Sequence, residues 1–276
     1  MISNKDAKVV NAFGEQWNRF DQSCLPEQEL QEIFESYFLI FPWDILPENS
    51  IGLDVGCGSG RWAKMVAPKV GLLHCIDASK AALDVAKENL AQEQNCQFHH
   101  ASVDDIPLPD ESADFAYSLG VFHHVPNTSD GIKSCVKKIK RGAPFLLYLY
   151  YAMDNKPLWY KWLWKVSEII RFCVSRMVFP LRLFASQVIA LLVYLPLARL
   201  ALFLEWVGLN VDYMPISEYK KRSFYVMRTD ALDRFGTRLE KRFTKNQILE
   251  MLEEVGLKNI SFSESSPYWL VVGYKK

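Results

Sequence analysis

The stretch Asp54-Val-Gly-Cys-Gly-Ser-Gly-Arg-Trp62 decides the fold of this chain. It follows the short apolar run Ile51-Gly-Leu53, and together they predict a buried strand, a glycine-rich turn and the first turn of a helix. Glycines in such a turn can adopt positive φ and let a ligand touch the main chain. The stretch therefore predicts an α/β sheet that presents backbone N–H groups to a nucleotide-like ligand.

The spacing of the glycines and the acid before them indicate which ligand. The pattern after Asp54 is Gly-x-Gly-x-Gly, whereas dinucleotide sites have Gly-x-Gly-x-x-Gly, with a wider turn around the pyrophosphate. An acid here would repel a pyrophosphate but can help hold a cationic amino-acid group, directly or through water, which favours S-adenosylmethionine. About twenty residues on, His74-Cys-Ile-Asp77 predicts the end of the next strand, where the Asp77 carboxylate can accept both ribose hydroxyls.

With these motifs the chain resembles the class I S-adenosylmethionine-dependent methyltransferases, with a methyltransferase-11-like core. The resemblance extends through Ala101–Asp110, which is similar to the family's adenine-binding loop, and Ser112–Val125, which is similar to its fourth strand. Ser102 stands where the family has an adenine-binding Asp, and Asp104 is nearby but out of register. The resemblance implies S-adenosylmethionine as cofactor, held by Asp54, Gly56, Cys57, Gly58, Gly60, Asp77, Ala78, Ser102, Val103, Leu119 and Trp17.

Other interpretations of the same residues stay open. A glycine-rich turn can be purely structural, and Asp77 alone is also typical of an acid at a helix N-terminus. A dinucleotide dehydrogenase is the nearest competing enzyme, and the turn spacing argues against it. A non-catalytic module that binds S-adenosylmethionine within a methyltransferase fold is the alternative to an enzyme.

Composition sets the broad class. The chain has 276 residues, 50% of them hydrophobic, which suffices for one sizeable core plus an elaboration. The 32 basic residues balance the 32 acidic ones, so no net charge recruits nucleic acid. Six cysteines without a C-x-x-C pair and an N-terminus without an apolar signal predict a reduced, cytoplasmic protein. The pairs His99-His100 and His123-His124 lack Cys or carboxylate at ligand spacing, so no metal site is predicted.

Strands alternate with helical segments, which predicts a doubly wound parallel sheet. A helix is predicted over Ser79–Leu90, and a second begins at the capping box Thr244-Lys-Asn-Gln247 and runs over Lys245–Val255. The family resemblance adds a closing antiparallel hairpin and so a Rossmann-like, seven-stranded α/β fold with a helical insertion after the fifth strand. The predicted strands are Gly52–Val55, Leu72–Asp77, Gln97–His100, Asp114–Leu119, Pro144–Tyr150, Asn259–Phe262 and Tyr268–Gly273.

Four parts are expected along the chain. Residues 1–50 form an N-terminal helical cap over the cofactor, with Trp17 and Phe20 as an apolar wall, and residues 51–152 form the cofactor-binding core. Residues 153–228 form a helical, apolar insertion, and residues 229–276 supply the last helix and hairpin.

The insertion is unusually apolar. Pro157–Arg171 predicts an amphipathic helix rich in tryptophan, and Leu183–Ala198 is a run of sixteen uncharged residues that contains Pro196. Sixteen residues fall short of the ~20 that span a bilayer, and the proline further disfavours a spanning helix. Three interpretations stay open: a cap buried on the core or in a homodimer, a peripheral membrane contact through 154–209, and a soluble pocket for an apolar acceptor.

The expected chemistry is methyl transfer to a small-molecule or lipid-linked acceptor, as in similar bacterial proteins. His123 and His124 follow the fourth strand at the sheet's carboxyl edge, and an imidazole there can accept a proton from the acceptor. His124 is the preferred base because it resembles the second His of the family's His-His-Val turn. A structural role for both histidines is the alternative.

Overall fold

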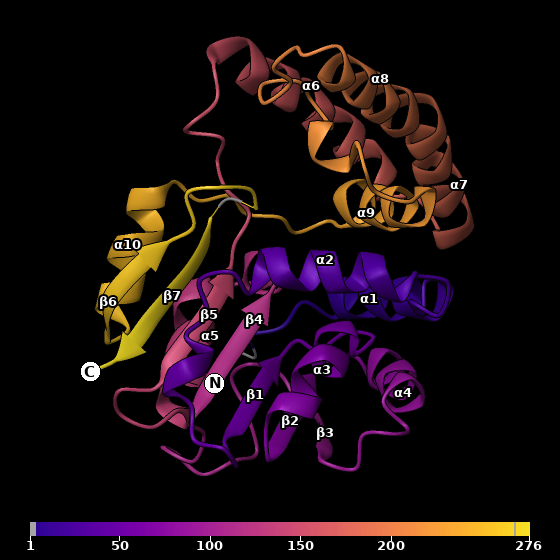
Figure 1. The fold of residues 1–276 in the computed structure, drawn as a ribbon. Coiled ribbons are helices and arrows are strands. Elements are labelled where there is room, and N and C mark those ends of the chain that lie inside the picture. The colour runs from indigo at the N-terminus through magenta and orange to yellow at the C-terminus, as the bar shows by residue number, and fades with distance from the viewer. Residues whose placement is uncertain (1–3, 268) are drawn as a thin grey trace. The chain divides into compact units, whose positions relative to one another are not determined.

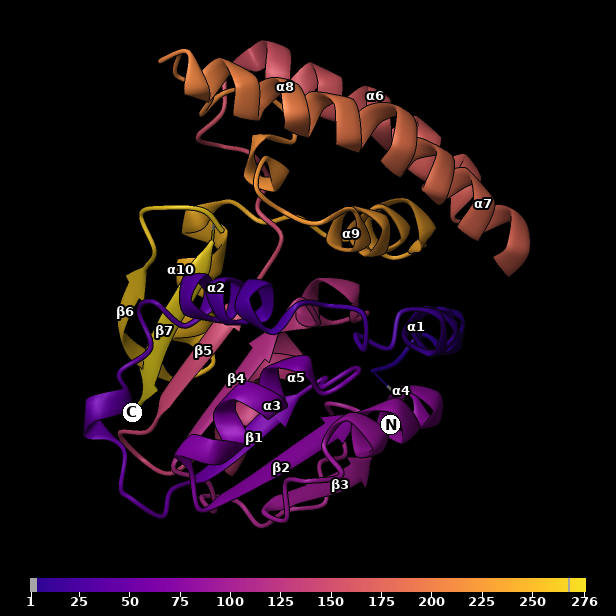
Figure 2. The ribbon, with the colours of Figure 1, turned by 45° about the vertical axis from the view of Figure 1, so that its right-hand side comes forward.

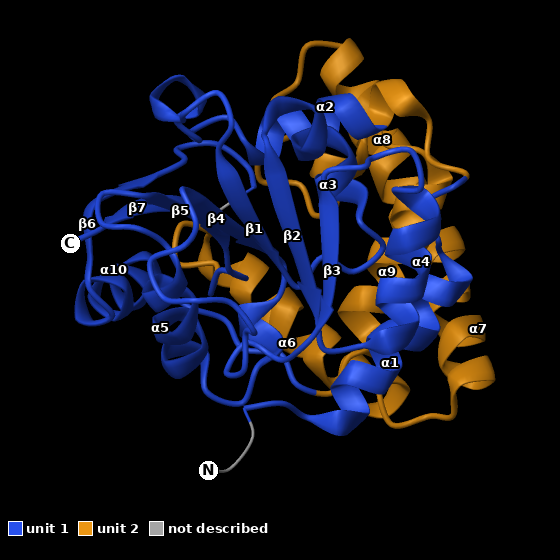
Figure 3. Cartoon of the chain, turned by 90° about the horizontal axis from the view of Figure 1, so that it is seen from below, with its two compact units in different colours: residues 1–23, 30–152, 239–276 blue, residues 24–29, 153–238 orange. Residues whose placement is uncertain are grey.

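The computed structural model describes residues 4–267 and 269–276. The chain divides into two compact units, shown in different colours in Figure 3. Unit 1 comprises the residues up to Ser23, 30–152 and 239–276, and unit 2 comprises 24–29 and 153–238. The helix α9 (Phe224–Gly236) lies in unit 2, where it packs against α7 (Phe179–Ile189).

A seven-stranded sheet forms the centre of unit 1 (Figure 1). Its order is β3-β2-β1-β4-β5-β7-β6, with β7 antiparallel to both its neighbours and the other pairs parallel. This confirms the doubly wound sheet and the closing hairpin. The strands are β1 (Ile51–Val55), β2 (Leu72–Asp77), β3 (Cys96–His100), β4 (Phe115–Leu119), β5 (Pro144–Tyr148), β6 (Leu257–Phe262) and β7 (Leu270–Lys275). The last predicted strand therefore begins later than expected, and its first residue, Tyr268, lies outside the described residues.

The helices of unit 1 follow from capping and apolar spacing. Ser79 caps α4 by accepting the Ala82 N–H, and the capping box of α10 has both reciprocal bonds, as predicted. The central strands are buried along almost their whole length, as expected of a parallel sheet covered on both faces. The helical elements are α1 (Ala7–Arg19), α2 (Glu27–Tyr37, whose first residues belong to unit 2), η1 (Trp43–Ile45), α3 (Arg61–Val66), η2 (Ala67–Lys69), α4 (Lys80–Asn89), η3 (Phe122–His124), α5 (Thr128–Lys138) and α10 (Lys245–Glu254).

Unit 2 is helical and has a small core of its own. Its elements are α6 (Leu158–Val174), α7 (Phe179–Ile189), the π-helical turn η4 (Ala190–Tyr194), α8 (Leu195–Trp206), η5 (Ser217–Tyr219) and α9 (Phe224–Gly236). In this core one side chain of α6 packs with buried residues of η4, α8 and α9. The core residues are Val174, Ala190, Tyr194, Ala198, Met227, Ala231 and Phe235.

The apolar run does not end at Pro196. Figure 2 shows α7, η4 and α8 as one continuous helix beside α6, and this helix covers Phe179–Trp206, 28 residues. The wider π-turn lies just before Pro196, which has no N–H to donate, so the helix continues where the sequence predicted an interruption. Among the described residues this is the one helix that is long and apolar enough to cross a bilayer, a test that buried helices of soluble proteins also pass.

Candidate active site

A cavity lies in unit 1 at the carboxyl ends of the first four strands. Its floor is formed by Val55 of β1, Ile76 of β2 and Leu119 of β4, and β1 lies between β2 and β4 in the sheet. The order of the strands reverses at this point, and open α/β sheets bind their ligands at such a switch.

The glycine turn forms one wall of this cavity. Gly56, Gly58 and Gly60 all have positive φ, as their spacing predicted. The N–H groups of Gly56 and Cys57 both donate to the Ile76 carbonyl, at 2.7 and 3.0 Å, which holds the turn against the end of β2. A Cβ at Gly56 would lie 2.4 Å from a methyl group of Val121, so the packing itself requires glycine there.

Asp77 connects the turn to the next helix. One oxygen accepts the Gly58 N–H at 2.9 Å and the other accepts the Ser79 N–H at 2.7 Å. Burial raises the pKa of this carboxyl, and the two N–H donors oppose that shift. Each carboxylate oxygen has two lone pairs, so Asp77 can accept further bonds from a ligand in the cavity that it lines.

The N-terminal segment forms the opposite wall. Phe13 and Trp17 of α1 line the cavity, and the Trp17 indole passes so close to Gly58 that a Cβ there would lie 2.9 Å from Nε1. Gly14 packs equally closely on α4, since a Cβ would lie 2.7 Å from Ser79 Oγ. Phe20 is buried and does not line the cavity.

Sequence reasoning missed the residues that precede α1. Asn4, Lys5 and Asp6 line the cavity, and Asn4 holds this segment in place. Its backbone N–H donates to Asp104, its side-chain amide donates to the Asn127 carbonyl, and its side-chain oxygen accepts the Asn127 N–H, at 2.9, 2.8 and 2.7 Å. No short motif signals these contacts, because the partners lie about a hundred or more residues along the chain.

The loop expected to bind adenine lies at the cavity as predicted. Ser102 and Val103 line it, whereas Asp104 does not. The Ser102 hydroxyl donates to the Asp104 carboxylate, which also accepts the Asn4 N–H. Asp104 therefore orders the loop and the N-terminal segment, and the hydroxyl oxygen of Ser102 keeps lone pairs for a ligand.

Three of the predicted cofactor residues do not line the cavity: Asp54, Cys57 and Gly60. The Asp54 side chain is buried, and burial raises its pKa to about 8, opposed by the Tyr117 hydroxyl and assisted by the charge of Asp77. Its Oδ2 has no hydrogen-bond partner among the described residues. The Cys57 side chain is also buried, and Gly60 is the N-cap of α3. Direct contact of these residues with a cofactor stays a prediction.

The two histidines have different environments. His124 lines the cavity beside the Phe13 ring, with centroids 5.0 Å apart, and its Nδ1 lies 2.6 Å from the Leu239 carbonyl. A carbonyl only accepts, so Nδ1 carries the proton and the lone pair of the neutral ring is on Nε2. His123 is fully buried, stacks on Tyr150 at 3.6 Å and does not line the cavity. Burial lowers the pKa of His123 well below its usual value.

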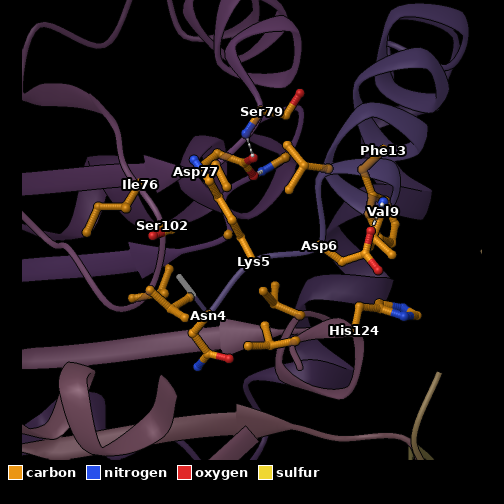
Figure 4. A pocket seen from close by; sticks show the side chains of 18 of the residues that line it. Asn4, Lys5, Asp6, Val9, Phe13, Ile76, Asp77, Ser79, Ser102 and His124 are labelled. Atoms are coloured by element: carbon orange, nitrogen blue, oxygen red, sulfur yellow. Dashed lines mark hydrogen bonds between the residues drawn. The ribbon is translucent and has the colours of Figure 1, made fainter. Parts of the chain in front are cut away.

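The remaining lining residues that were predicted are Gly56, Gly58, Asp77, Ala78, Val103, Leu119 and Trp17, and the cavity brings them together with Ser102 and His124. In Figure 4, Asp77 and Ser79 lie on one side of the cavity and His124 lies on the other, with Phe13 and Val9 of α1 nearby. Among the described residues no group of three or more His, Cys, Asp or Glu side chains could hold a metal ion.

The strand order, the antiparallel seventh strand and the glycine turn followed by an acid are those of the class I S-adenosylmethionine-dependent methyltransferase fold. Comparison with known proteins agrees, since residues 53–147 match the family model described as "Methyltransferase domain". Residues 53–147 thus carry a methyltransferase domain, and S-adenosyl-L-methionine is the cofactor of that domain. The side chains present fit it: a carboxylate for the ribose, a turn without side chains and an indole wall.

Similar proteins share this part of the chain. An uncharacterized methyltransferase of Bacillus subtilis, YcgJ, is 29% identical over 109 residues, which cover 38% of this chain and 43% of the relative. A ubiquinone biosynthesis O-methyltransferase of Coxiella burnetii is 30% identical over 105 residues, with the same two coverages. The chain thus spans less than half the length of these curated relatives.

The similarity of fold covers more of the chain. A solved structure of a candidate S-adenosyl-L-methionine-dependent methyltransferase from Methanococcus maripaludis has a TM-score of 0.52 at 13% identity. The match covers 100% of this chain and 97% of the other. At this identity the similarity shows the fold alone.

Proposed function

We propose that the chain transfers a methyl group from S-adenosylmethionine to a small-molecule or lipid-linked acceptor. The observation that carries the proposal is that one cavity is lined both by Asp77, beside the glycine turn, and by His124 across from it. A donor site and a proton acceptor thus line the same cavity. The name of the Coxiella relative, which refers to ubiquinone biosynthesis, supports an acceptor with an apolar tail.

The residues of the cavity would act mainly by positioning. When bound, S-adenosylmethionine supplies an electrophilic methyl group on a sulfonium. Asp77 accepts the ribose hydroxyls, and Trp17 and Phe13 of α1 exclude water, so that the acceptor can attack in line at close range. In that transfer the acceptor oxygen or nitrogen would lose a proton as it gains the methyl group, and His124 Nε2 would be the group that takes up this proton.

Residues 154–209 have two proposed roles in this function, a peripheral contact with the inner face of the membrane or a homodimer interface. A cytoplasmic location is part of the proposal, supported by six cysteines that are all free thiols. The alternative function is a module that binds S-adenosylmethionine without turnover.

The proposal is tested by donor binding and by turnover. Calorimetry should show at least tenfold weaker binding of S-adenosylmethionine to Asp77→Ala, because bonds to a charged acceptor contribute about 1.5 to 3 kcal/mol each. Asp84→Ala is the matched control, since Asp84 is an exposed acid of α4 that does not line the cavity. Unchanged affinity in Asp77→Ala would refute the donor site.

Turnover distinguishes the enzyme from the binding module. The protein is incubated with methyl-labelled donor and with separate lipid and water-soluble extracts of cells. Labelled product in either extract supports methyl transfer, and His124→Asn should lower its rate roughly 10² to 10⁴-fold with donor affinity unchanged. Donor binding without labelled product in both extracts would favour the module.

A further inference from the structure

Unit 2 carries nearly all the exposed large hydrophobic side chains of the chain. Of the 24 such side chains among the described residues, 22 lie between Leu158 and Tyr213, and the other two are Leu39 and Ile45. Monomeric soluble proteins rarely expose contiguous apolar patches larger than a few hundred Å². The apolar area on unit 2 therefore requires a covering partner.

In the long helix Phe179–Trp206 the large apolar side chains are exposed and the small or polar ones are buried, the reverse of a helix in a soluble protein. Its buried positions hold small or polar residues, spaced mostly four apart: Arg182, Ser186, Ala190, Tyr194, Ala198 and Ala201. Its exposed positions hold large apolar ones: Leu181, Phe184, Val188, Leu191, Leu192, Val193, Leu200, Phe203 and Trp206. Only 22% of its most apolar window is buried, whereas a core helix of a soluble protein is mostly buried. The apolar side of this helix is its outer side.

The inner side of the same helix faces polar groups. Arg182 donates to the Gly236 carbonyl at the end of α9, and Arg228 of α9 donates to the side chain of Gln187. Arg234, also of α9, donates to Ser167 Oγ at 3.0 Å and pairs with Glu168 of α6. Unit 2 thus holds hydrogen-bonded polar groups between its helices, beside its small apolar core, and large apolar side chains outside. An apolar surrounding favours this arrangement.

Charged and aromatic side chains are also placed as at a lipid interface. Between Leu158 and Val207 the chain has six basic and two acidic residues. Both acids form ion pairs: Glu168 pairs with Arg171 and Arg234, and Glu205 pairs with Lys220. A bond from Lys156 Nζ to the Asp212 carbonyl, 2.9 Å, joins the start of α6 to the segment after α8. Exposed aromatic rings gather at this end: Trp159, Trp162, Trp206 and Tyr213. Tryptophan and tyrosine prefer the headgroup level of a membrane.

We propose that the outer faces of α6 and of Phe179–Trp206, together the apolar face, dock onto an anionic lipid bilayer. The helices lie in the plane of the interface, since only one side of them is apolar and α9 with its charged residues packs on the other. A second copy of the chain fits less well, because a two-fold interface would bring the same unbalanced basic residues, such as Lys161 and Lys165, toward each other. Anionic lipid complements them.

This inference does not rest on methyl transfer, and its test needs no cofactor. The full chain is sedimented with vesicles of phosphatidylcholine and phosphatidylglycerol, and with vesicles of phosphatidylcholine alone. We expect binding to the anionic vesicles, weaker binding to the neutral ones, and a several-fold loss at high salt, which screens the charges. Lys161→Gln with Lys165→Gln should reduce the salt-sensitive part of the binding.

Two leucines of equal exposure provide a matched pair of variants. Leu192 on the apolar face and Leu39 in unit 1 are both 66% exposed. Leu192→Asp should weaken vesicle binding at least tenfold, and Leu39→Asp should leave it unchanged. Circular dichroism checks that both variants fold, which is expected since both positions are exposed.

Two outcomes would overturn the inference. One is a protein that stays in the supernatant with anionic vesicles at low salt. The other is a stable dimer in light scattering that Leu192→Asp dissociates and that shows no vesicle binding, in which case a second copy covers the face. Both outcomes leave donor binding at Asp77 untouched, so failure here is distinguishable from failure of the proposed function.

Discussion

Gly56→Ala tests the close approach on which the cofactor turn depends. The added Cβ would lie 2.4 Å from Val121 Cγ2, and the backbone at Gly56 has φ +78°. A left-handed conformation costs a residue with a Cβ about 1 to 2 kcal/mol, and forcing a methyl group into a packed site costs about 1 to 3 kcal/mol more. We therefore expect the variant to be about 2 to 5 kcal/mol less stable than the parent chain.

Two further variants separate the backbone cost from the steric cost. Gly142 also has φ +78° but has nothing within 4 Å of an added Cβ, so Gly142→Ala should show the backbone cost alone. Val121→Ala removes the two methyl groups that clash and leaves the Val121 Cβ, which lies 3.1 Å from the Cβ added at position 56. The double variant Gly56→Ala with Val121→Ala should therefore regain most of the stability lost to the steric clash.

The assay is urea unfolding of the parent chain, the three single variants and the double variant, with calorimetry of S-adenosylmethionine binding. The Gly56 N–H anchors the turn to the Ile76 carbonyl at 2.7 Å, so displacement of the turn should also weaken donor binding at least tenfold in Gly56→Ala and not in Gly142→Ala. The reasoning is refuted if Gly56→Ala and Gly142→Ala lose the same free energy of unfolding, or if Val121→Ala fails to rescue.

Three other substitutions probe the framework of the site. Burial raises the pKa of Asp54 to about 8, so between pH 4 and 8 the folded chain keeps a proton that the unfolded chain releases. The free energy of unfolding should therefore fall over this range, by up to about 1.4 kcal/mol per pH unit. Asp54→Asn should flatten this slope in urea titrations, and an unchanged slope would show that Asp54 is ionised in the folded state. Gly14→Ala should destabilise the chain and weaken donor binding, because the Cβ would lie 2.7 Å from Ser79 Oγ; a more stable variant, as helix propensity alone would give, contradicts that contact. Thr244→Ala should cost about 1 kcal/mol by removing the cap of α10, more than Gln247→Ala, and thermal unfolding of both variants checks the order.

Much of unit 1 could be predicted from the sequence, because the forces that shape it act over short distances along the chain. The glycine turn, Asp77 at the end of β2 and the capping box at Thr244 each depend on residues within a few positions of one another. Strand-and-helix alternation then limits the sheet to a few arrangements, and parallel order follows because helix-containing crossovers join the strands. The donor side of the cavity was predictable for the same reason.

Other features were decided only by the tertiary structure. Asn4 meets Asp104 and Asn127, and His124 meets the Leu239 carbonyl, through contacts that span about a hundred residues or more of sequence. Asp54 is buried because the sheet around β1 is covered on both faces. Apolar spacing identified the helices of unit 2 but not which side of them is covered, since periodicity reports an apolar stripe and not its partner. Only the packed structure shows that the small and polar residues of Phe179–Trp206 face inward and its large apolar residues face out.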